Sequence, residues 1–108
     1  MISFVIPLKN EEENLRALHE ELVASIRAGA LDPVEIIFID DGSTDASWSV
    51  VEEIAQKDAQ VRGIKFRRNF GKAAALTAGF AASSGSVVFT LDGDLQDDPV
   101  EIPRFRFK

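Results

Sequence analysis

The residues with the clearest chemical potential form a short acidic run. Asp92 and Asp94 are separated by one glycine, and Gln96 follows two positions later. Carboxylates at positions i and i+2 of a tight turn can face the same way, because glycine lets the backbone bend without steric penalty. Two carboxylates and an amide carbonyl form a hard-oxygen set suited to Mg²⁺ or Mn²⁺. A solvated acidic turn is the alternative, but the run directly follows an apolar segment, and this position favours a metal site.

A second acidic run covers residues 40–45 and also begins at the end of an apolar segment. We expect Asp40 or Asp41 to accept hydrogen bonds from a ribose or a base edge. Ser43 or Asp45 is expected to cap the helix that follows, since short polar side chains accept hydrogen bonds from the first free N–H groups of a helix.

The main concentration of basic residues is formed by Arg67, Arg68 and Lys72. It opens a predicted helix, whose positive dipole end favours anions. A diphosphate would suit this position. The alternative is that these cations face solvent and offset an acidic surface.

Four apolar, β-branched runs predict strands at residues 2–6, 34–39, 62–67 and 86–91. Helical patterns lie between them, and this alternation predicts an α/β fold, with a parallel sheet flanked by helices and joined by right-handed crossovers. Residues 1–108 are expected to form one domain. The polar runs follow the predicted strands, and parallel strands end at one sheet edge, where open α/β sheets bind ligands.

The predicted helices follow from apolar spacing and from end signals. The first carries leucines at spacings of three and four and is expected to end at Gly29. Its His19 is expected to be exposed. The third covers about residues 72–82 and is expected to bury Leu76 and Phe80. Asp98-Pro99 predicts the start of a fourth helix.

Composition narrows the functional classes. The chain has 108 residues, a net charge of -6 and no cysteine. An acidic surface disfavours binding to nucleic acid, and the absence of cysteine excludes disulfides and thiolate metal sites. A reducing compartment is compatible with this composition, and we expect a cytoplasmic protein. No apolar stretch approaches the roughly 20 residues that span a bilayer.

Three common motifs do not fit the chain. Gly71-Lys72 lacks the leading glycine and the trailing Ser/Thr of a P-loop. No Gly-x-Gly-x-x-Gly follows a predicted strand. The acidic run lacks the glycine and the bidentate glutamate of an EF-hand, because Asp97 and Pro103 stand at those positions.

Four motifs in order resemble those of the family 2 glycosyltransferases of the GT-A fold. They lie at residues 5–15, 40–45, 68–72 and 92–97. Within that family the chain looks most like polyprenyl-phosphate glycosyltransferases, including dolichol-phosphate mannosyltransferase-like enzymes. The resemblance implies that residues 1–108 form the nucleotide-sugar-binding part of the enzyme.

The resemblance also implies site residues. The nucleoside pocket would be lined by Pro7, Asn10 and Glu11, with Asp40 or Asp41 on the base or ribose. Arg68 and Lys72 would lie near the diphosphate. The metal and donor site would contain Asp92, Asp94 and Gln96, with Asp92 and Asp94 as the catalytic residues.

The implied reaction moves a sugar, with inversion, from a nucleotide-diphosphate sugar to a polyprenyl phosphate, with Mg²⁺ or Mn²⁺ as cofactor. Enzymes of this kind continue past the acidic motif, so we expect these 108 residues to bind donor and metal without efficient transfer. A longer parent protein would be associated with the cytoplasmic face of a membrane. An uncovered sheet edge would favour a homo-oligomer.

Two other protein classes share features with this sequence. A receiver-type signalling domain matches the length and the α/β pattern, but it needs an acidic pair after the first strand and a phosphorylatable Asp after the third. This chain has Pro7-Leu8-Lys9 and basic residues there. A nucleotide-binding module without chemistry of its own is the other alternative.

Overall fold

Strands and helices alternate along the chain in the computed structural model, which describes residues 1–31 and 33–91. In chain order the described elements are β1 (Ile2–Leu8), α1 (Leu15–Ala28), β2 (Val34–Asp40), α2 (Ser47–Lys57), β3 (Val61–Lys65), α3 (Lys72–Ala82) and β4 (Val87–Thr90). The predicted α/β alternation is confirmed. The predicted metal residues Asp92, Asp94 and Gln96 and the predicted helix at Asp98-Pro99 lie outside the described residues.

The four strands form one parallel sheet in the order β3-β2-β1-β4. The two central strands, β1 and β2, are buried at every position, which confirms that their continuous apolar runs reflect helices on both faces. The outer strands β3 and β4 are more exposed and shorter than the predicted segments. Each outer strand pairs with another strand on one side only and is more exposed. Its apolar pattern in the sequence is therefore weaker.

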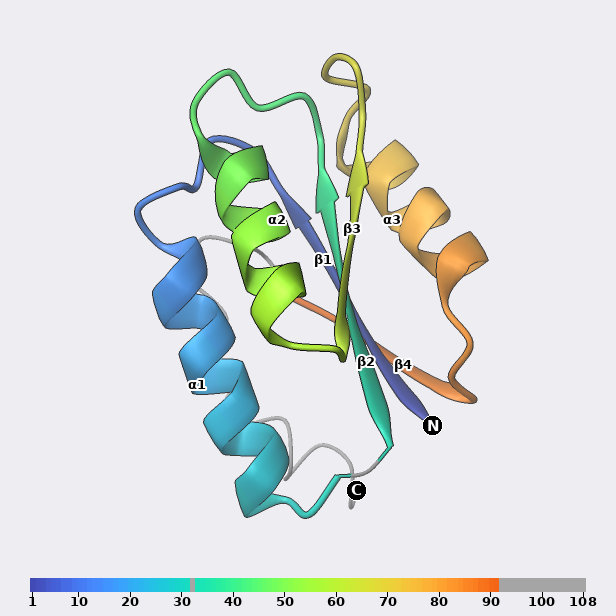
Figure 1. Cartoon of the computed structure of the whole chain (residues 1–108). Helices are drawn as coiled ribbons and strands as arrows, with labels where there is room; N and C mark the ends of the chain where they lie inside the picture. The colour runs from blue at the N-terminus through green and yellow to red at the C-terminus, as the bar shows by residue number, and fades with distance from the viewer. Residues whose placement is uncertain (32, 92–108) are drawn as a thin grey trace.

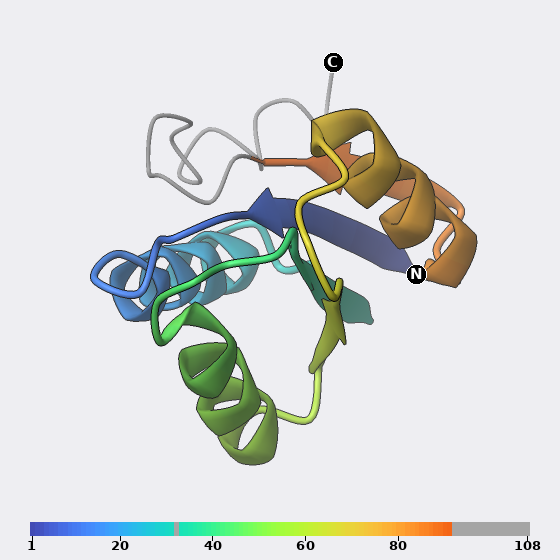
Figure 2. The same cartoon turned by 90° about the horizontal axis from the view of Figure 1, so that it is seen from above.

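Helices cover both faces of the sheet, with α1 and α2 on one face and α3 on the other (Figures 1 and 2). The period-2 alternation of strand side chains divides the core accordingly. Phe4, Ile6 and Phe38 belong to the larger cluster with α1 and α2. Val5 and Ile37 belong to the smaller cluster against α3. The core is thus two layers, one on each side of β1 and β2.

The third helix packs differently from its prediction. Phe80 is 49% exposed, and Leu76 is only partly buried, whereas Ala75 and Gly79 are the buried residues. A Cβ built on Gly79 would lie 2.3 Å from Cγ1 of Val5. Small residues let the α3 backbone approach the sheet closely, so the helix presents Gly79 rather than Phe80 to it. The expected burial of Phe80 is therefore wrong.

The first helix ends at Gly29, as predicted. His19 on this helix is not exposed as expected, because its side chain is 18% exposed and its Nε2 lies 2.8 Å from the Oδ2 of Asp58. This contact joins α1 to the residue that follows α2. Across residues 1–31 and 33–91, no helix combines the length and the apolarity needed to cross a membrane.

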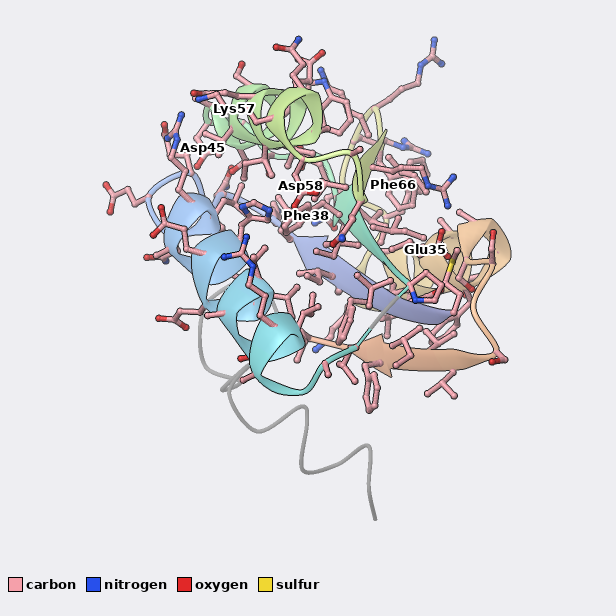
Figure 3. The ribbon with its side chains drawn as sticks, turned by 60° about the horizontal axis from the view of Figure 1, so that its bottom comes forward. Glu35, Phe38, Asp45, Lys57, Asp58 and Phe66 are labelled. Atoms are coloured by element: carbon pink, nitrogen blue, oxygen red, sulfur yellow. The ribbon has the colours of Figure 1, made fainter. Side chains whose placement is uncertain are left out.

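The amino-terminal edge of the sheet is held by Glu35, which lies at the opposite end of the molecule from Asp45 (Figure 3). The Glu35 carboxylate accepts hydrogen bonds from the Ser3 hydroxyl, the Ser84 N–H and Arg62. Burial raises the pKa of Glu35, but these three donors together hold it below its ordinary value. One carboxylate thus links β1, β2, β3 and the segment before β4.

Candidate functional site

The sheet has a topological switch point between β1 and β4. The chain moves outward from β1 to β3 and then returns through α3 to place β4 on the other side of β1. Ligands of open α/β sheets bind at the carboxyl edge beside such a point. Leu91, which follows β4, is buried and donates its N–H to the Val5 carbonyl at 3.1 Å. The predicted metal motif begins at the next residue in the sequence, Asp92.

Asn10 joins the loop after β1 to the loop after β2. Its Oδ1 accepts hydrogen bonds from the Thr44 N–H at 2.8 Å, the Thr44 hydroxyl at 3.3 Å and the Asp45 N–H at 3.3 Å. In return, its own N–H donates to the Ser43 hydroxyl at 2.8 Å. Asn10 has a φ of 54°, a conformation that asparagine tolerates better than most residues. Two of the sequence motifs therefore form one hydrogen-bonded unit.

Asp45 adds a second link between these two loops. Its carboxylate accepts hydrogen bonds from the N–H and the hydroxyl of Ser47, at 2.9 and 2.6 Å, and from the Glu12 N–H at 3.4 Å. The Ser47 hydroxyl also accepts the N–H of Glu11. Burial raises the pKa of Asp45, but the donors from Ser47 and Glu12 hold it below its ordinary value. Asp45 thus binds the first residue of α2, whereas Ser43 binds Asn10 instead of a helix end.

Asp40 ends β2, and only one of its two carboxylate oxygens has a hydrogen-bond partner among the described residues. Oδ1 accepts the Ser43 N–H at 2.8 Å. Oδ2 is buried and has no hydrogen-bond partner among residues 1–31 and 33–91. A buried polar atom without a partner is costly. The position therefore suits a donor from a ligand, a cation or a part of the protein beyond the described residues.

Asp41 is bound to the loop after β3. Its Oδ1 accepts the Phe70 N–H at 2.8 Å, while its Oδ2 accepts the Gly71 N–H at 3.1 Å and the Asn69 amide at 3.2 Å. Its side chain is buried, with the residue 6% exposed. The two neighbouring acids thus differ, since both oxygens of Asp41 accept hydrogen bonds from described residues and only one oxygen of Asp40 does.

Gly42 brings the same two loops into direct contact. It has a φ of 74°, and a Cβ placed on it would lie 2.3 Å from the Arg68 carbonyl carbon and 2.4 Å from the Asn69 nitrogen. Both the conformation and the space exclude a side chain. In the sequence, the glycine directly after the acidic pair is the signal from which this contact could have been suspected.

The basic residues lie on this tethered loop and at the start of α3. Arg67 and Arg68 are exposed, and the Arg68 guanidinium carbon lies 4.8 Å from the centre of the Phe70 ring. The Phe70 ring in turn packs edge to face against the Phe66 ring, with 5.6 Å between the ring centres. Lys72 is the first residue of α3. The stacked ring limits where the Arg68 charge can lie.

A pocket lies over the loop between β1 and α1. Its lining consists of Asn10, Glu11, Glu12, Glu13, Asn14 and Asp45. Four carboxylates in this lining repel phosphate and accept hydrogen bonds from hydroxyl and N–H donors. The pocket is therefore chemically distinct from the basic loop after β3.

Most of the predicted site residues within the described ranges lie at the carboxyl edge. Asn10 and Asp41 lie in linked loops and Asp40 is the last residue of β2, whereas Pro7 is buried within β1, opposite Ile39. Among residues 1–31 and 33–91, no group of three or more His, Asp and Glu side chains could hold a metal. The sequence did not single out the donors that organise these loops, which are Thr44, Ser47, Asn69 and Phe70.

Comparisons with known proteins relate this chain to glycosyltransferases. A model of the family described as "Glycosyl transferase family 2" matches residues 3–106. The chain is 44% identical over 104 residues to an undecaprenyl-phosphate 4-deoxy-4-formamido-L-arabinose transferase of Pectobacterium carotovorum, covering 95% of this chain and 32% of the relative. The enzyme of the same name from Proteus mirabilis is equally similar, with the same coverage. The chain thus spans about a third of the length of these relatives.

Solved structures share the fold. A mannosyltransferase of Pyrobaculum calidifontis, in complex with GDP-Man and Mn²⁺, matches 86% of this chain and 27% of its own, with a TM-score of 0.72 and 21% identity. Glucosyl-3-phosphoglycerate synthase of Mycobacterium tuberculosis, in complex with phosphoglyceric acid, matches 95% of this chain and 37% of its own, with a TM-score of 0.66 and 30% identity. The parallel sheet with its two helical layers is the α/β architecture of GT-A glycosyltransferases. With a family model that matches nearly its whole length, the chain belongs to glycosyl transferase family 2.

Proposed function

We propose that residues 1–108 form the nucleotide-sugar-binding part of an inverting glycosyltransferase whose acceptor is a polyprenyl phosphate. The observation that carries this proposal is the hydrogen-bonded edge of the sheet, where Asn10 and Asp41 join three motif loops beside the switch point. A receiver-type domain has no support here, because basic residues rather than a phosphorylatable aspartate follow β3.

The nucleoside is the part of the donor that suits the acidic side of this edge. The pocket that contains Asn10 and Glu11 offers acceptors to ribose hydroxyls and base N–H groups. Asp40 has a buried oxygen without a partner among the described residues, and a base or ribose donor would satisfy it. Both oxygens of Asp41, in contrast, already accept hydrogen bonds from residues 69–71. This contrast favours Asp40 over Asp41 as the acid that contacts the nucleoside.

The diphosphate would lie toward the basic loop and the metal motif. Arg68 and Lys72 supply positive charge there, and Asp92, Asp94 and Gln96 are the proposed ligands of Mg²⁺ or Mn²⁺. Such an ion offsets the negative charge that develops on the leaving nucleotide. The Pyrobaculum calidifontis mannosyltransferase, in complex with GDP-Man and Mn²⁺, supports this cofactor choice at the level of the fold.

The acceptor is proposed from the relatives, which are named for undecaprenyl phosphate. A phosphate acceptor is already an anion near neutral pH, so it needs less help from a general base than a sugar hydroxyl. A lipid acceptor also implies that the full-length protein works at a membrane, and we place the reaction at its cytoplasmic face. Because the chain spans about a third of its relatives, we propose donor binding without efficient transfer for these 108 residues.

Amide NMR spectra recorded with UDP- and GDP-sugars and the diamagnetic ion Mg²⁺ test this proposal. The expected shifts are at Asn10, Ser43 and Gly71, with little change at Ser84 and Gly85 on the opposite edge. Shifts confined to the Ser84 edge would contradict the placement of the donor. A parallel assay with undecaprenyl phosphate should yield no more than trace glycolipid, and rapid turnover would contradict the limited role of this chain.

A further inference from the structure

We infer that Phe70 is a positioning residue for Arg68, whose guanidinium its ring holds in place for the diphosphate of the donor. The inference rests on the proposed function of this edge and adds a role for the large apolar side chain of the loop after β3. Phe70 is 53% exposed, and a single exposed ring needs no explanation by itself. This ring, however, carries the Arg68 guanidinium, whose carbon lies 4.8 Å from the ring centre.

The Phe70 ring is anchored through its backbone and through its side chain. Its N–H donates to the Asp41 carboxylate at 2.8 Å, which ties the loop to the end of β2. The ring packs edge to face against the Phe66 ring, with 5.6 Å between the ring centres, and Phe66 packs against the smaller core cluster under α3. A ring held at both points presents a fixed surface to the guanidinium.

Arg68 differs from two other arginines in what holds its charge. Arg16 forms an ion pair with Glu53, and Arg62 forms one with Glu35. Within the part of the chain that the structure describes, no carboxylate forms an ion pair with Arg68. A carboxylate would neutralise the guanidinium and compete with a phosphate. The ring instead attracts the cation through its quadrupole and uses none of its N–H donors.

The consequence is a cation that is placed before the ligand binds. An arginine side chain has many rotamers, and ordering it during binding costs entropy. The contact with the Phe70 ring restricts these rotamers in the free protein, so less entropy is lost when Arg68 binds a diphosphate. Because a phenyl ring has no donor to offer a phosphate, the effect of Phe70 on diphosphate affinity should act through Arg68.

Side-chain NMR without ligand tests the contact between the ring and the guanidinium. Ring currents should shift the Arg68 side-chain protons upfield in the wild type and in Phe70→Tyr, which keeps the ring. Phe70→Leu keeps an apolar side chain beside Phe66 but should return those protons to their ordinary positions. Phe80→Leu is the matched control, because it removes an exposed ring on α3, and it should leave the Arg68 protons shifted. Unshifted Arg68 protons in the wild type, or a shift that survives Phe70→Leu, would overturn the inference.

A double-mutant cycle with pyrophosphate and Mg²⁺ tests the effect on binding. Phe70→Leu should weaken binding about two- to fivefold, which is the range of an exposed cation–π contact, and Phe70→Tyr should keep the wild-type affinity. In an Arg68→Gln background, Phe70→Leu should have little further effect. An equal loss in both backgrounds would overturn the inference, because the ring would then act independently of Arg68. Failure of the wild-type chain to bind pyrophosphate would count against the proposed function alone, since the NMR experiment needs no ligand.

Discussion

The side-chain oxygen of Asn10 lies 2.8 Å from the backbone nitrogen of Thr44, 34 positions later in the chain. This hydrogen bond and its neighbours turn two loops into a single rigid rim of the candidate site. The polar residues after β1 and those after β2 act as one unit, because each loop supplies hydrogen-bond partners to the other.

Replacing Asn10 by Ala should destabilise the protein by about 1–2 kcal/mol, mainly because alanine tolerates the positive φ poorly. The change leaves the Thr44 and Asp45 N–H groups without their acceptor and places Ala at a φ of 54°. Urea denaturation measures the loss. Asn10→Asp retains an acceptor and should lose clearly less, so equal losses for the two variants would contradict the role given to the acceptor oxygen.

Glu35 should make the stability of the fold fall in acid. Its pKa is held below the ordinary 4.5, so its ionised form stabilises the folded state at neutral pH, and this contribution is lost as the pH falls below about 4.5 through the folded-state pKa. Glu35→Gln should lower the free energy of unfolding at pH 7 by about 1–3 kcal/mol. The variant should also lose less stability than wild type between pH 6 and pH 3, and parallel acid curves would contradict this account.

Gly79→Ala should destabilise the protein although alanine favours helices. A methyl group would lie 2.3 Å from Val5 Cγ1 and 2.9 Å from Ile39 Cδ1, and overpacking of this kind costs about 1–3 kcal/mol. Thermal unfolding followed by circular dichroism measures the change. As a control, Ala73→Gly on the exposed side of α3 should cost about 1 kcal/mol through helix propensity alone. A more stable Gly79→Ala variant would contradict the close approach of α3.

Arg68→Gln should weaken pyrophosphate binding about tenfold, which corresponds to about 1.4 kcal/mol. The exposed guanidinium is stacked on Phe70 and lies on the loop fixed by Asp41. Arg27→Gln removes the same charge near the far end of α1 and should leave the affinity unchanged. Equal losses in both variants would indicate a general charge effect instead of a local site.

The central strands could be predicted from sequence because they are buried on both faces and therefore apolar at nearly every position. The face of α3 could not, since a helix rich in alanine has little amphipathic pattern, and the packing is decided by Gly79 approaching Val5. The motif loops were also found in sequence. Their partners were not, because the hydrogen bonds of Asn10 and Asp41 join residues about 30 positions apart. The alternatives Asp40 and Asp41 are distinguished only by those bonds.

Calorimetric titration of the chain with UDP- and GDP-sugars, with and without Mn²⁺, tests the central claim most directly. We expect one class of donor to bind, the affinity to rise with Mn²⁺, and the metal dependence to disappear in Asp94→Asn. No binding by any donor in either condition, or the same Mn²⁺ dependence in Asp94→Asn, would contradict the claim that this sheet edge is a metal-assisted nucleotide-sugar site.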